Sequence, residues 1–257
     1  MGADTPFTVV SWNVLADAYV KPAYFPYTDP AVLDPASRRP RVVDRLVSLV
    51  DGGADVICLQ ELEPDFFETI RGALPSFEGR YTQKAGKPDG CAVLVRRALG
   101  AATFRDLTYR DGTGGVAVVA RVEPLGCSIA TTHLKWQAAD VPPETRLGRG
   151  ELIELFEAWI APGERWVVCG DLNAPYDSPV LDVAFSRGFD DAYASMPLAS
   201  TCNSNARAKR IDFILHTRDL RATPSPLPSI DDMTPLPSSS EPSDHLAIRA
   251  VLEPAVR

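Results

Sequence analysis

Residues 167–179, VVCGDLNAPYDSP, pass directly from an apolar strand to polar chemistry. Residues 166–169 are all apolar, which is typical of a buried strand. Asp171 and Asn173 follow at once, beside a glycine and a proline that favour a turn. A carboxylate and an amide placed at the end of a buried strand indicate a functional site at one edge of a sheet.

Apolar segments of this kind recur along the chain, with few helical patterns between them. Bounded by Gly, Pro and Asp, they predict strands in FTVVSW, DVICLQ, CAVLVRR, GVAVVARV, CSIATTHL, RWVVCGD, RIDFIL and HLAIRAVL. Two other segments, RPRVVDRLVSLVDGG and ETRLGRGELIELFEAWIAPG, place apolar residues at helical spacing. Many strands with few helices predict two sheets packed face to face, with the helices outside.

The length and composition favour one globular domain over residues 1–257. Hydrophobic residues make up 45% of the chain and charged residues 23%, and no apolar run is long enough to span a membrane. The start, MGADTPFTVVSWN, lacks a basic segment followed by an apolar one, so we expect a cytoplasmic protein. The five cysteines are scattered without metal-type spacing, which favours buried free thiols.

The net charge limits the classes of partner. A formal value of −8 argues against a protein that coats duplex DNA through a broad basic face. It leaves open a nucleic-acid or nucleotide substrate, because an acidic metal site accounts for part of the negative charge and a local basic patch can still hold phosphate.

Polar residues follow several predicted strands at the point where each strand ends. Each one alone has a structural interpretation, since Asn13 is compatible with an Asx-turn and Glu61 with a cap on the helix after Pro64. Before the last strand lies a long Pro/Ser loop, ATPSPLPSIDDMTPLPSSSEPSD, of a kind that is either functional or disordered. We expect His216 to lie on the surface. The candidate set is Asn13, Glu61, His133, Asp171, Asn173, Asp212, Asp244 and His245.

Several carboxylates that meet at one edge of a sheet repel one another, and a buried unpaired carboxylate is costly. A divalent cation removes this conflict. Hard oxygen ligands without a Cys or His cluster favour Mg²⁺ or Mn²⁺ over Zn²⁺. The histidines and amides supply the donors that phosphoester hydrolysis needs as negative charge develops on the phosphate.

Seven motifs, taken in order, resemble the endonuclease/exonuclease/phosphatase superfamily, which includes deoxyribonuclease I, AP endonucleases and inositol polyphosphate 5-phosphatases. They are WNVLAD, LQELE, DGCAVL, THLKW, GDLNAP, IDFIL and PSDHL, and together they cover nearly the whole chain. The resemblance implies an α/β (α+β) fold like that of deoxyribonuclease I, a four-layer α/β/β/α sandwich of two mixed sheets.

Within the superfamily, the chain looks most similar to the branch of nocturnin, the carbon-catabolite-repressor-type deadenylases, the Angel proteins and the 2′,5′-phosphodiesterases. The segments that carry this narrower resemblance are NVLADAY, RRPRVVDRL, KAGKPDGCAVL and the Pro-rich run into PSDHL. For the metal, the resemblance implies that Glu61 is the principal ligand of Mg²⁺ (or Mn²⁺). Asn13 would lie close to it, and Asp244 would complete the metal environment.

The resemblance also implies roles for the other candidates. Asp171 would position or deprotonate the attacking water, and Asn173 would donate a hydrogen bond to the phosphate. His133 would donate to the scissile phosphate. His245 would do the same or transfer a proton, oriented by Asp212, and a neutral imidazole near pH 7 suits that last role.

Departures from the family pattern bear on the substrate. AP endonucleases have an Asp where this chain has Leu15, which weakens a DNA-repair function. The deadenylases resemble one another in an aromatic residue shortly before the Asp of the IDFIL strand, whereas this chain has Arg207, Lys209 and Arg210. Loss of a stacking side chain argues against a strong poly(A) preference, and added cations suit a substrate with further phosphates.

Three residues elsewhere are further candidates for substrate contacts. Nocturnin-like proteins also have a lysine at the position of Lys135, where it resembles a phosphate clamp. Trp136 either stacks on a base or packs at a strand end. Lys84, like Lys87 in the same turn, either reaches a phosphate or is solvated surface.

The main hypothesis is a Mg²⁺-dependent phosphoesterase, a phosphodiesterase or 3′-exoribonuclease acting on single-stranded RNA 3′ ends. The alternative is a phosphatase or cyclic phosphodiesterase that removes a 2′-phosphate or a 2′,3′-cyclic phosphate from RNA or a phosphorylated nucleotide cofactor. The basic stretch before Asp212 favours the alternative, and the branch resemblance favours the nuclease. A catalytically dead binding protein is a third class, which the intact candidate set argues against. We expect a monomer without a membrane or protein partner.

Overall fold

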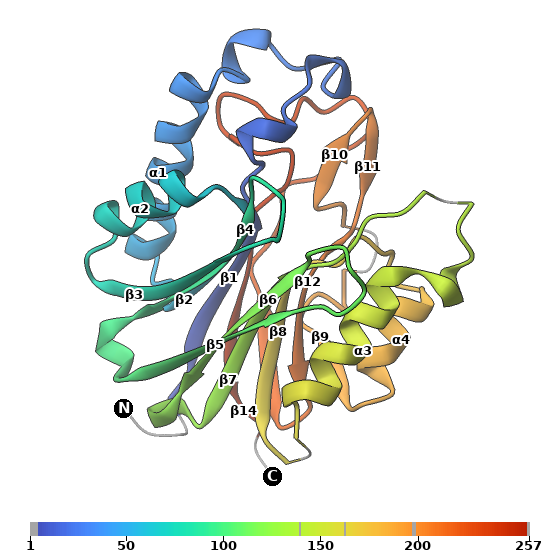
Figure 1. Cartoon of the computed structure of the whole chain (residues 1–257). Helices are drawn as coiled ribbons and strands as arrows, with labels where there is room; N and C mark the ends of the chain where they lie inside the picture. Colours follow the sequence, from blue (N-terminus) through green and yellow to red (C-terminus); the bar gives the residue numbers. More distant parts are fainter. Residues whose placement is uncertain (1–4, 139, 162, 197–198, 256–257) are drawn as a thin grey trace.

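The computed structural model describes residues 5–138, 140–161, 163–196 and 199–255 and contains two six-stranded sheets packed face to face (Figure 1). Helices cover the outer face of each sheet. One neighbouring pair of strands in each sheet is parallel and the others are antiparallel, so both sheets are mixed. This arrangement confirms the predicted four-layer α/β/β/α sandwich.

The first sheet is built around two parallel strands, β1 and β2, which align Asn13 with Gln60. The register of β2 with β4 shifts at a bulge between Leu59 and Leu62, so β2 ends irregularly. In spatial order its strands are β13 (Leu220–Pro224), β14 (Ile248–Pro254), β1 (Phe7–Asn13), β2 (Val56–Leu62), β4 (Gly90–Arg96) and β3 (Phe77–Gln83).

The second sheet is built around the parallel pair β7 and β8. In spatial order its strands are β5 (Ala102–Thr108), β6 (Val116–Val122), β7 (Cys127–His133), β8 (Arg165–Asp171), β12 (Asp212–Thr217) and β9 (Phe189–Asp191). The strands β10 (Cys202–Ser204) and β11 (Arg207–Lys209) form a separate hairpin. It projects from the end of the sandwich at which β1 ends and β12 begins.

Four α-helices lie in the described part of the chain: α1 (Pro35–Asp51), α2 (Pro64–Ala73), α3 (Leu147–Trp159) and α4 (Pro179–Phe185). The two helices predicted from periodicity correspond to α1 and α3. The Asp34 side chain caps α1 by accepting the backbone N–H of Ala36. Short 3₁₀ helices are η1 (Asp17–Tyr19), η2 (Pro22–Tyr24), η3 (Pro30–Val32), η4 (Arg97–Leu99), η5 (Glu123–Leu125) and η6 (Pro143–Thr145).

The core has three layers that follow the alternation of side chains along the strands. Val9 and Cys58 point between the two sheets, and their neighbours Val10 and Ile57 point outward against α1 and α2. Trp166 packs outward against α3 and α4 in the same way. Strands buried on both faces hold their ends rigidly, which suits a site that is built from strand ends.

The apolar patterns predict the central strands but not the four strands at the sheet edges, β3, β13, β5 and β9. An edge strand has a neighbour on one side only, and most residues of β3 and β5 are partly or fully exposed. They therefore need no continuous apolar pattern. The three-residue strands β10 and β11 are too short to give one.

His216 is buried in β12, with 6% of its surface exposed, and the prediction that it lies on the surface is wrong. The edge strand β9 pairs outside β12 and covers it, aligning His216 with Asp190. The three-residue strand β9 has only a weak sequence pattern, so the sequence does not predict the strand that covers His216. Nδ1 of His216 lies 3.1 Å from the carbonyl oxygen of Thr217, which gives this ring nitrogen a hydrogen-bond partner.

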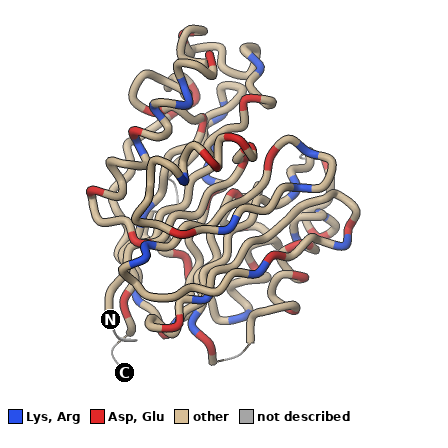
Figure 2. Tube along the Cα trace, turned by 60° about the vertical axis from the view of Figure 1, so that its left-hand side comes forward, with Lys and Arg blue, Asp and Glu red and all other residues tan. Residues whose placement is uncertain are grey.

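The cysteines agree with the expectation from the sequence. All five cysteines are free and buried. Among the described residues, no helix combines the length and the apolar character needed to cross a bilayer. In the view of Figure 2, Lys and Arg positions are interspersed with Asp and Glu and form no continuous basic face.

Candidate active site

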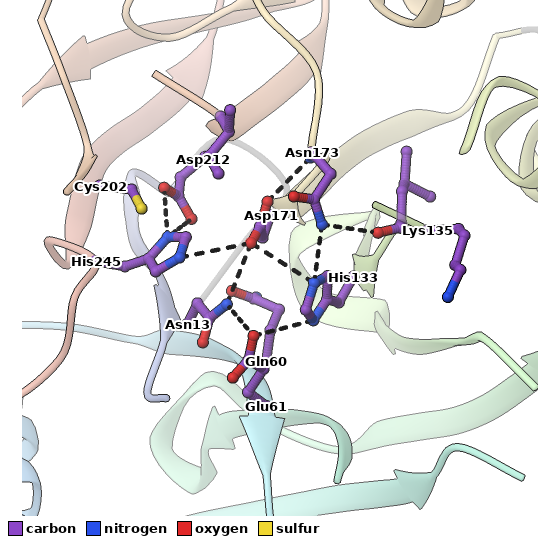
Figure 3. Close-up of polar contacts among 12 residues, drawn as sticks. Asn13, Gln60, Glu61, His133, Lys135, Asp171, Asn173, Cys202, Asp212 and His245 are labelled. Atoms are coloured by element: carbon purple, nitrogen blue, oxygen red, sulfur yellow. Dashed lines mark hydrogen bonds and ion pairs between the residues drawn. The ribbon is translucent and has the colours of Figure 1, made fainter. Parts of the chain in front are cut away.

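The ends of the central strands meet at one edge of the sandwich and bring the candidate residues together. Figure 3 labels all of them except Asp244, which lies 4.0 Å from His245. On the second sheet, Asp171 lies directly between His133 on β7 and Asp212 on β12. Asn13 and Glu61 come from the ends of β1 and β2 on the first sheet, and Asn13 reaches across to Asp171. The site therefore spans both sheets.

The backbone is unusual where it presents two of these side chains. Glu61, at the β2 bulge, and Asn173 have left-handed φ values of 52° and 49°. Non-glycine residues rarely adopt this conformation, and it concentrates at functional sites where the surrounding structure enforces it. Gly170, next to Asp171, is equally constrained, because a Cβ there would lie 1.9 Å from the carbonyl oxygen of Thr132.

His245 is held in place by strands from both sheets. The indole of Trp12 donates to the carbonyl oxygen of His245 over 2.9 Å. Ser243 donates its hydroxyl to the Asn13 carbonyl and accepts the backbone N–H of His245. Nδ1 of the ring lies 2.9 and 3.0 Å from the two carboxylate oxygens of Asp212, so Nε2 faces the centre of the site. The Pro/Ser loop thus delivers Asp244 and His245 into the site.

Asp171 lies at the centre of the polar network. Its carboxylate accepts the backbone N–H of Asn173 at 2.9 Å and the Asn13 amide at 3.2 Å. The same Asn13 amide donates to Glu61 at 3.0 Å. One oxygen of Asp171 lies 3.6 Å from Nε2 of both His133 and His245, which places a carboxylate between two imidazoles.

Burial makes the ionised carboxylates costly. It raises the pKa of Glu61 to about 7, and the nearby charge of Asp244 adds to that rise. Burial likewise raises the pKa of Asp171 to about 6 and raises the pKa of Asp244. Carboxylates that resist ionisation near neutral pH at one site need a compensating positive charge.

The residues present fit a hard divalent cation. Oδ1 of Asp244 is buried and has no hydrogen-bond partner among the described residues, and it lies 4.0 Å from Nε2 of His245. A buried carboxylate oxygen that accepts no hydrogen bond, beside other acidic groups, is what an oxygen-ligated metal ion would satisfy. Asn13 is the exception, because its amide nitrogen faces the carboxylates while its oxygen accepts the Leu15 N–H at 3.0 Å. Its role as a ligand stays a prediction.

The pKa values of the two histidines of the site are shifted in opposite directions. Burial alone would lower the pKa of His245, but the carboxylates of Asp212 and Asp244 outweigh it and hold that pKa well above its usual value. The surrounding carboxylates therefore favour the protonated form of His245, and the neutral imidazole expected from the sequence stays a prediction. His133 has the opposite shift, because burial and the nearby charge of Lys84 hold its pKa well below the usual value.

A cleft of about 1080 Å³ opens over this cluster and gathers the lysines of the protein. The chain contains five lysines, and all five line the cleft: Lys21, Lys84, Lys87, Lys135 and Lys209. Arg146 and Arg207 line it as well. In an acidic protein, this concentration of cations over a buried acidic cluster favours a substrate with several negative charges.

The predicted substrate contacts fall into different environments. Lys84 is not solvated surface, since its ammonium lies 2.8 Å from buried Asp89. Arg210 is buried and forms an ion pair with Asp191, so its charge is already matched. Trp136 is 59% exposed and lines the cleft, which fits a surface for stacking better than packing. Lys135, Arg207 and Lys209 line the cleft without a side-chain ion pair among the described residues.

Sequence analysis missed Glu151, a buried residue of α3 that lines the cleft. One of its carboxylate oxygens accepts the backbone N–H of Lys135 at 2.6 Å, and the other accepts the Thr113 hydroxyl at 3.1 Å. Glu151 therefore anchors the segment that carries Lys135 and Trp136. An acidic residue on the buried face of a predicted amphipathic helix was the signal that could have found it.

We expect Glu151→Gln to stabilise the protein at pH 8 and to change little at pH 4.5. Burial raises the pKa of Glu151 from 4.5 to about 7. The folded state therefore binds more protons than the unfolded state between these values, and the free energy of unfolding falls as pH rises. Glutamine keeps the shape without this penalty, so the gain at pH 8 should be about 1–3 kcal/mol. Urea unfolding of both proteins across this range measures it, and a pH-independent difference would contradict it.

The chain is similar in sequence to a known family and to several of its members. The sequence model of the Endonuclease/Exonuclease/phosphatase family matches residues 10–245. Protein angel homolog 2 of Danio rerio is 27% identical over 218 residues, covering 75% of this chain and 37% of that protein. Carbon catabolite repressor protein 4 homolog 4 of Arabidopsis thaliana is 36% identical over 195 residues, covering 70% of this chain and 45% of that protein. The matched region thus spans less than half the length of these relatives.

Solved structures show the same fold. The structure of ANGEL2, described as a 2′,3′-cyclic phosphatase in complex with adenosine-2′,3′-vanadate, superposes with a TM-score of 0.78 at 18% identity, covering 98% of this chain and 97% of that one. The human nocturnin catalytic domain with bound sulfate gives a TM-score of 0.74 at 22% identity, covering 99% and 95%.

Proposed function

The chain belongs to the endonuclease/exonuclease/phosphatase family, and from that premise we propose that it is a Mg²⁺-dependent phosphoesterase that cleaves phosphodiesters at RNA 3′ ends. The observation that carries the proposal is Asp171, which lies 3.6 Å from two imidazole nitrogens, in a cluster with Glu61 and with an Asp244 oxygen that accepts no hydrogen bond. A carboxylate, two imidazoles and an acidic metal site are the groups that in-line attack on a phosphate requires.

In this proposal the cation would be held by Glu61 and Asp244, where it would neutralise charge on a phosphate oxygen. Asp171 orients the attacking water and accepts its proton. His245, charged and held by Asp212, donates to the phosphate or to the leaving oxygen. His133 faces the same space from the other side of Asp171.

A second candidate is removal of a terminal 2′-phosphate or opening of a 2′,3′-cyclic phosphate on RNA or on a phosphorylated nucleotide. The cations of the cleft favour it, because Lys135, Arg207 and Lys209 add positive charge beyond what one scissile phosphate needs. The 2′,3′-cyclic phosphatase activity named for the similar ANGEL2 structure is consistent with it. Both candidates use the same catalytic residues and differ in what the cleft holds.

Product analysis separates the two. Purified protein with Mg²⁺ would be given 5′-labelled RNA carrying 3′-hydroxyl, 2′-phosphate, 3′-phosphate or 2′,3′-cyclic ends, with EDTA and Glu61→Gln as negative controls. A ladder of shortened products from the 3′-hydroxyl RNA supports the exonuclease. Loss or opening of the terminal phosphate at unchanged chain length supports the second candidate, and no metal-dependent product from any end would refute both.

We expect Lys135→Met to raise KM about tenfold with little change in kcat, the pattern of a lost ionic contact made equally in the ground and transition states. The lysine lies beside His133 in sequence and lines the cleft. Initial-rate kinetics on the preferred end would measure the effect. Arg218→Met, which removes a cation paired with Asp190 on the exposed surface, is the matched control. Unchanged KM in Lys135→Met would return Lys135 to the class of solvated surface residues.

A further inference from the structure

His133 faces a hydrogen-bond donor at each of its ring nitrogens. The Lys84 ammonium lies 3.1 Å from Nδ1, and the amide nitrogen of Asn173 lies 3.0 Å from Nε2. An ammonium has three donors and no acceptor, so a hydrogen bond with Lys84 requires a lone pair on Nδ1, and a neutral imidazole has one lone pair and one proton. Only one of the two donors can therefore form a hydrogen bond with it.

Lys84 is the stronger competitor for the single lone pair. A charged donor forms a hydrogen bond roughly twice as strong as a neutral one. Its ammonium is also fixed in place, 2.8 Å from Oδ2 of the fully buried Asp89, whose Oδ1 accepts a 2.7 Å hydrogen bond from the Tyr19 hydroxyl. Asn173 has another acceptor for its amide, the carbonyl oxygen of Leu134 at 2.9 Å.

The segment that carries Tyr19 is itself anchored. Asp17, at the start of η1, forms ion pairs with Arg38 and Arg39 of α1. Arg39 extends this network to Glu63 and Asp65 at the start of α2. The position of the Lys84 ammonium is therefore fixed by protein contacts that extend to α1 and α2 and involve no substrate.

We propose that the chain Tyr19–Asp89–Lys84 selects the Nε2–H tautomer of His133 and thereby makes this histidine a hydrogen-bond donor toward the reacting phosphate. The inference rests on the proposed function, since the phosphate belongs to that proposal. Nε2 is the ring nitrogen that faces Asp171 and the centre of the site. Lys84 is thus a positioning residue that acts through His133.

The opposite tautomer would be unproductive. With the proton on Nδ1, the lone pair of Nε2 would accept from Asn173 and face the phosphate oxygens, which also carry lone pairs. The Nδ1 proton would in turn point at a cation that cannot accept it, and the Oε1 atom of Glu61, 3.9 Å from Nδ1, lies beyond hydrogen-bond distance. Lys84 therefore determines that Nδ1 of His133 accepts a hydrogen bond and that Nε2 donates one.

Nitrogen-15 NMR of the histidine side chains tests the proposal without any activity assay. The chain has three histidines, so their signals are few. His216 and His245 serve as internal references, because their Nδ1 atoms face a carbonyl oxygen and a carboxylate and should carry protons. We expect His133 alone to show a protonated Nε2 and an unprotonated Nδ1, with or without Mg²⁺. A protonated Nδ1 in the wild-type His133 would overturn the proposal.

Lys84→Met should shift the His133 signals toward the Nδ1–H form and lower kcat roughly 10- to 100-fold, the usual cost of losing the partner that orients a functional histidine. Lys135→Met, which removes a cleft lysine without contact to the ring, should leave the tautomer unchanged. A raised KM with an unchanged tautomer in Lys84→Met would show that Lys84 acts only as a phosphate clamp, and would refute the proposal.

The single variant leaves the buried Asp89 carboxylate without its partner, which endangers folding. The double variant Lys84→Met/Asp89→Asn removes both charges and is expected to give the same tautomer change. Failure of the proposed function would show as absent turnover in the wild type, whereas failure of this inference would show in the wild-type spectrum.

Discussion

Glu61→Gln is expected to lower kcat for Mg²⁺-dependent turnover by about 10³-fold or more, because a metal ion contributes several kcal/mol of charge stabilisation in the transition state and each 1.4 kcal/mol corresponds to about tenfold. Glu61 is placed for this role by the β2 bulge and a left-handed backbone, and it shares the Asn13 amide with Asp171. Glutamine preserves the side-chain shape but removes the charge that would hold the ion.

Two measurements distinguish loss of the metal from loss of the fold. Binding of Mn²⁺, followed by calorimetry, should weaken strongly in Glu61→Gln, while the thermal midpoint without metal should stay the same or rise, because burial makes the ionised carboxylate costly. Glu68→Gln, an exposed change in α2, is the matched control and should leave both unchanged. Full activity in Glu61→Gln would remove Glu61 from the metal site.

The sequence predicts the part of the site that is built from the ends of buried strands. His133, Asp171 and Asp212 each stand at the polar end of an apolar segment, and strands that neighbour one another in a sheet bring such ends together. The register that puts Asp171 directly between the other two comes from pairing over long sequence separations. No single segment contains that information.

The sequence does not predict residues whose role depends on a contact with a partner far away in the chain. Asp89 lies in a motif that was recognised, but its contacts are Tyr19, 70 residues earlier, and Lys84 across a turn. Glu151 contacts the backbone of Lys135 from another element. The sequence around a single polar residue does not indicate which group that residue contacts in the folded protein.

Charge states were also beyond the sequence, because they depend on burial and neighbours rather than on residue type. His133 and His245 are the same amino acid at two strand ends, yet the pKa of one is depressed and that of the other raised. The difference arises from Lys84 beside the first and Asp212 beside the second. Arg210 is a similar case, since Asp191 neutralises a cation that the sequence assigned to the substrate.

Asp171→Asn is expected to lower kcat by about 10²- to 10⁴-fold with little change in KM, the usual contribution of a positioned proton acceptor. The Asp171 carboxylate is buried and lies 3.6 Å from Nε2 of both His133 and His245. This position between the two imidazoles gives it the role of proton acceptor in the proposal. Asparagine retains an oxygen that can accept the Asn173 N–H, which preserves the turn after β8. Steady-state kinetics and thermal melting would be compared with Asp182→Asn, an exposed acid-to-amide change on α4.

The pH dependence gives the sharper test of Asp171. Burial raises the pKa of its carboxyl to about 6, and only the ionised form can accept a proton from water, so wild-type kcat should rise as pH increases through this value. A cation at Glu61 and Asp244 favours the ionised form, so higher Mg²⁺ concentrations should move this rise to lower pH. Asp171→Asn should lose the rise along with the activity. If the variant kept the same acidic limb at reduced rate, the limb would belong to another group, and Asp171 would position the water without accepting its proton.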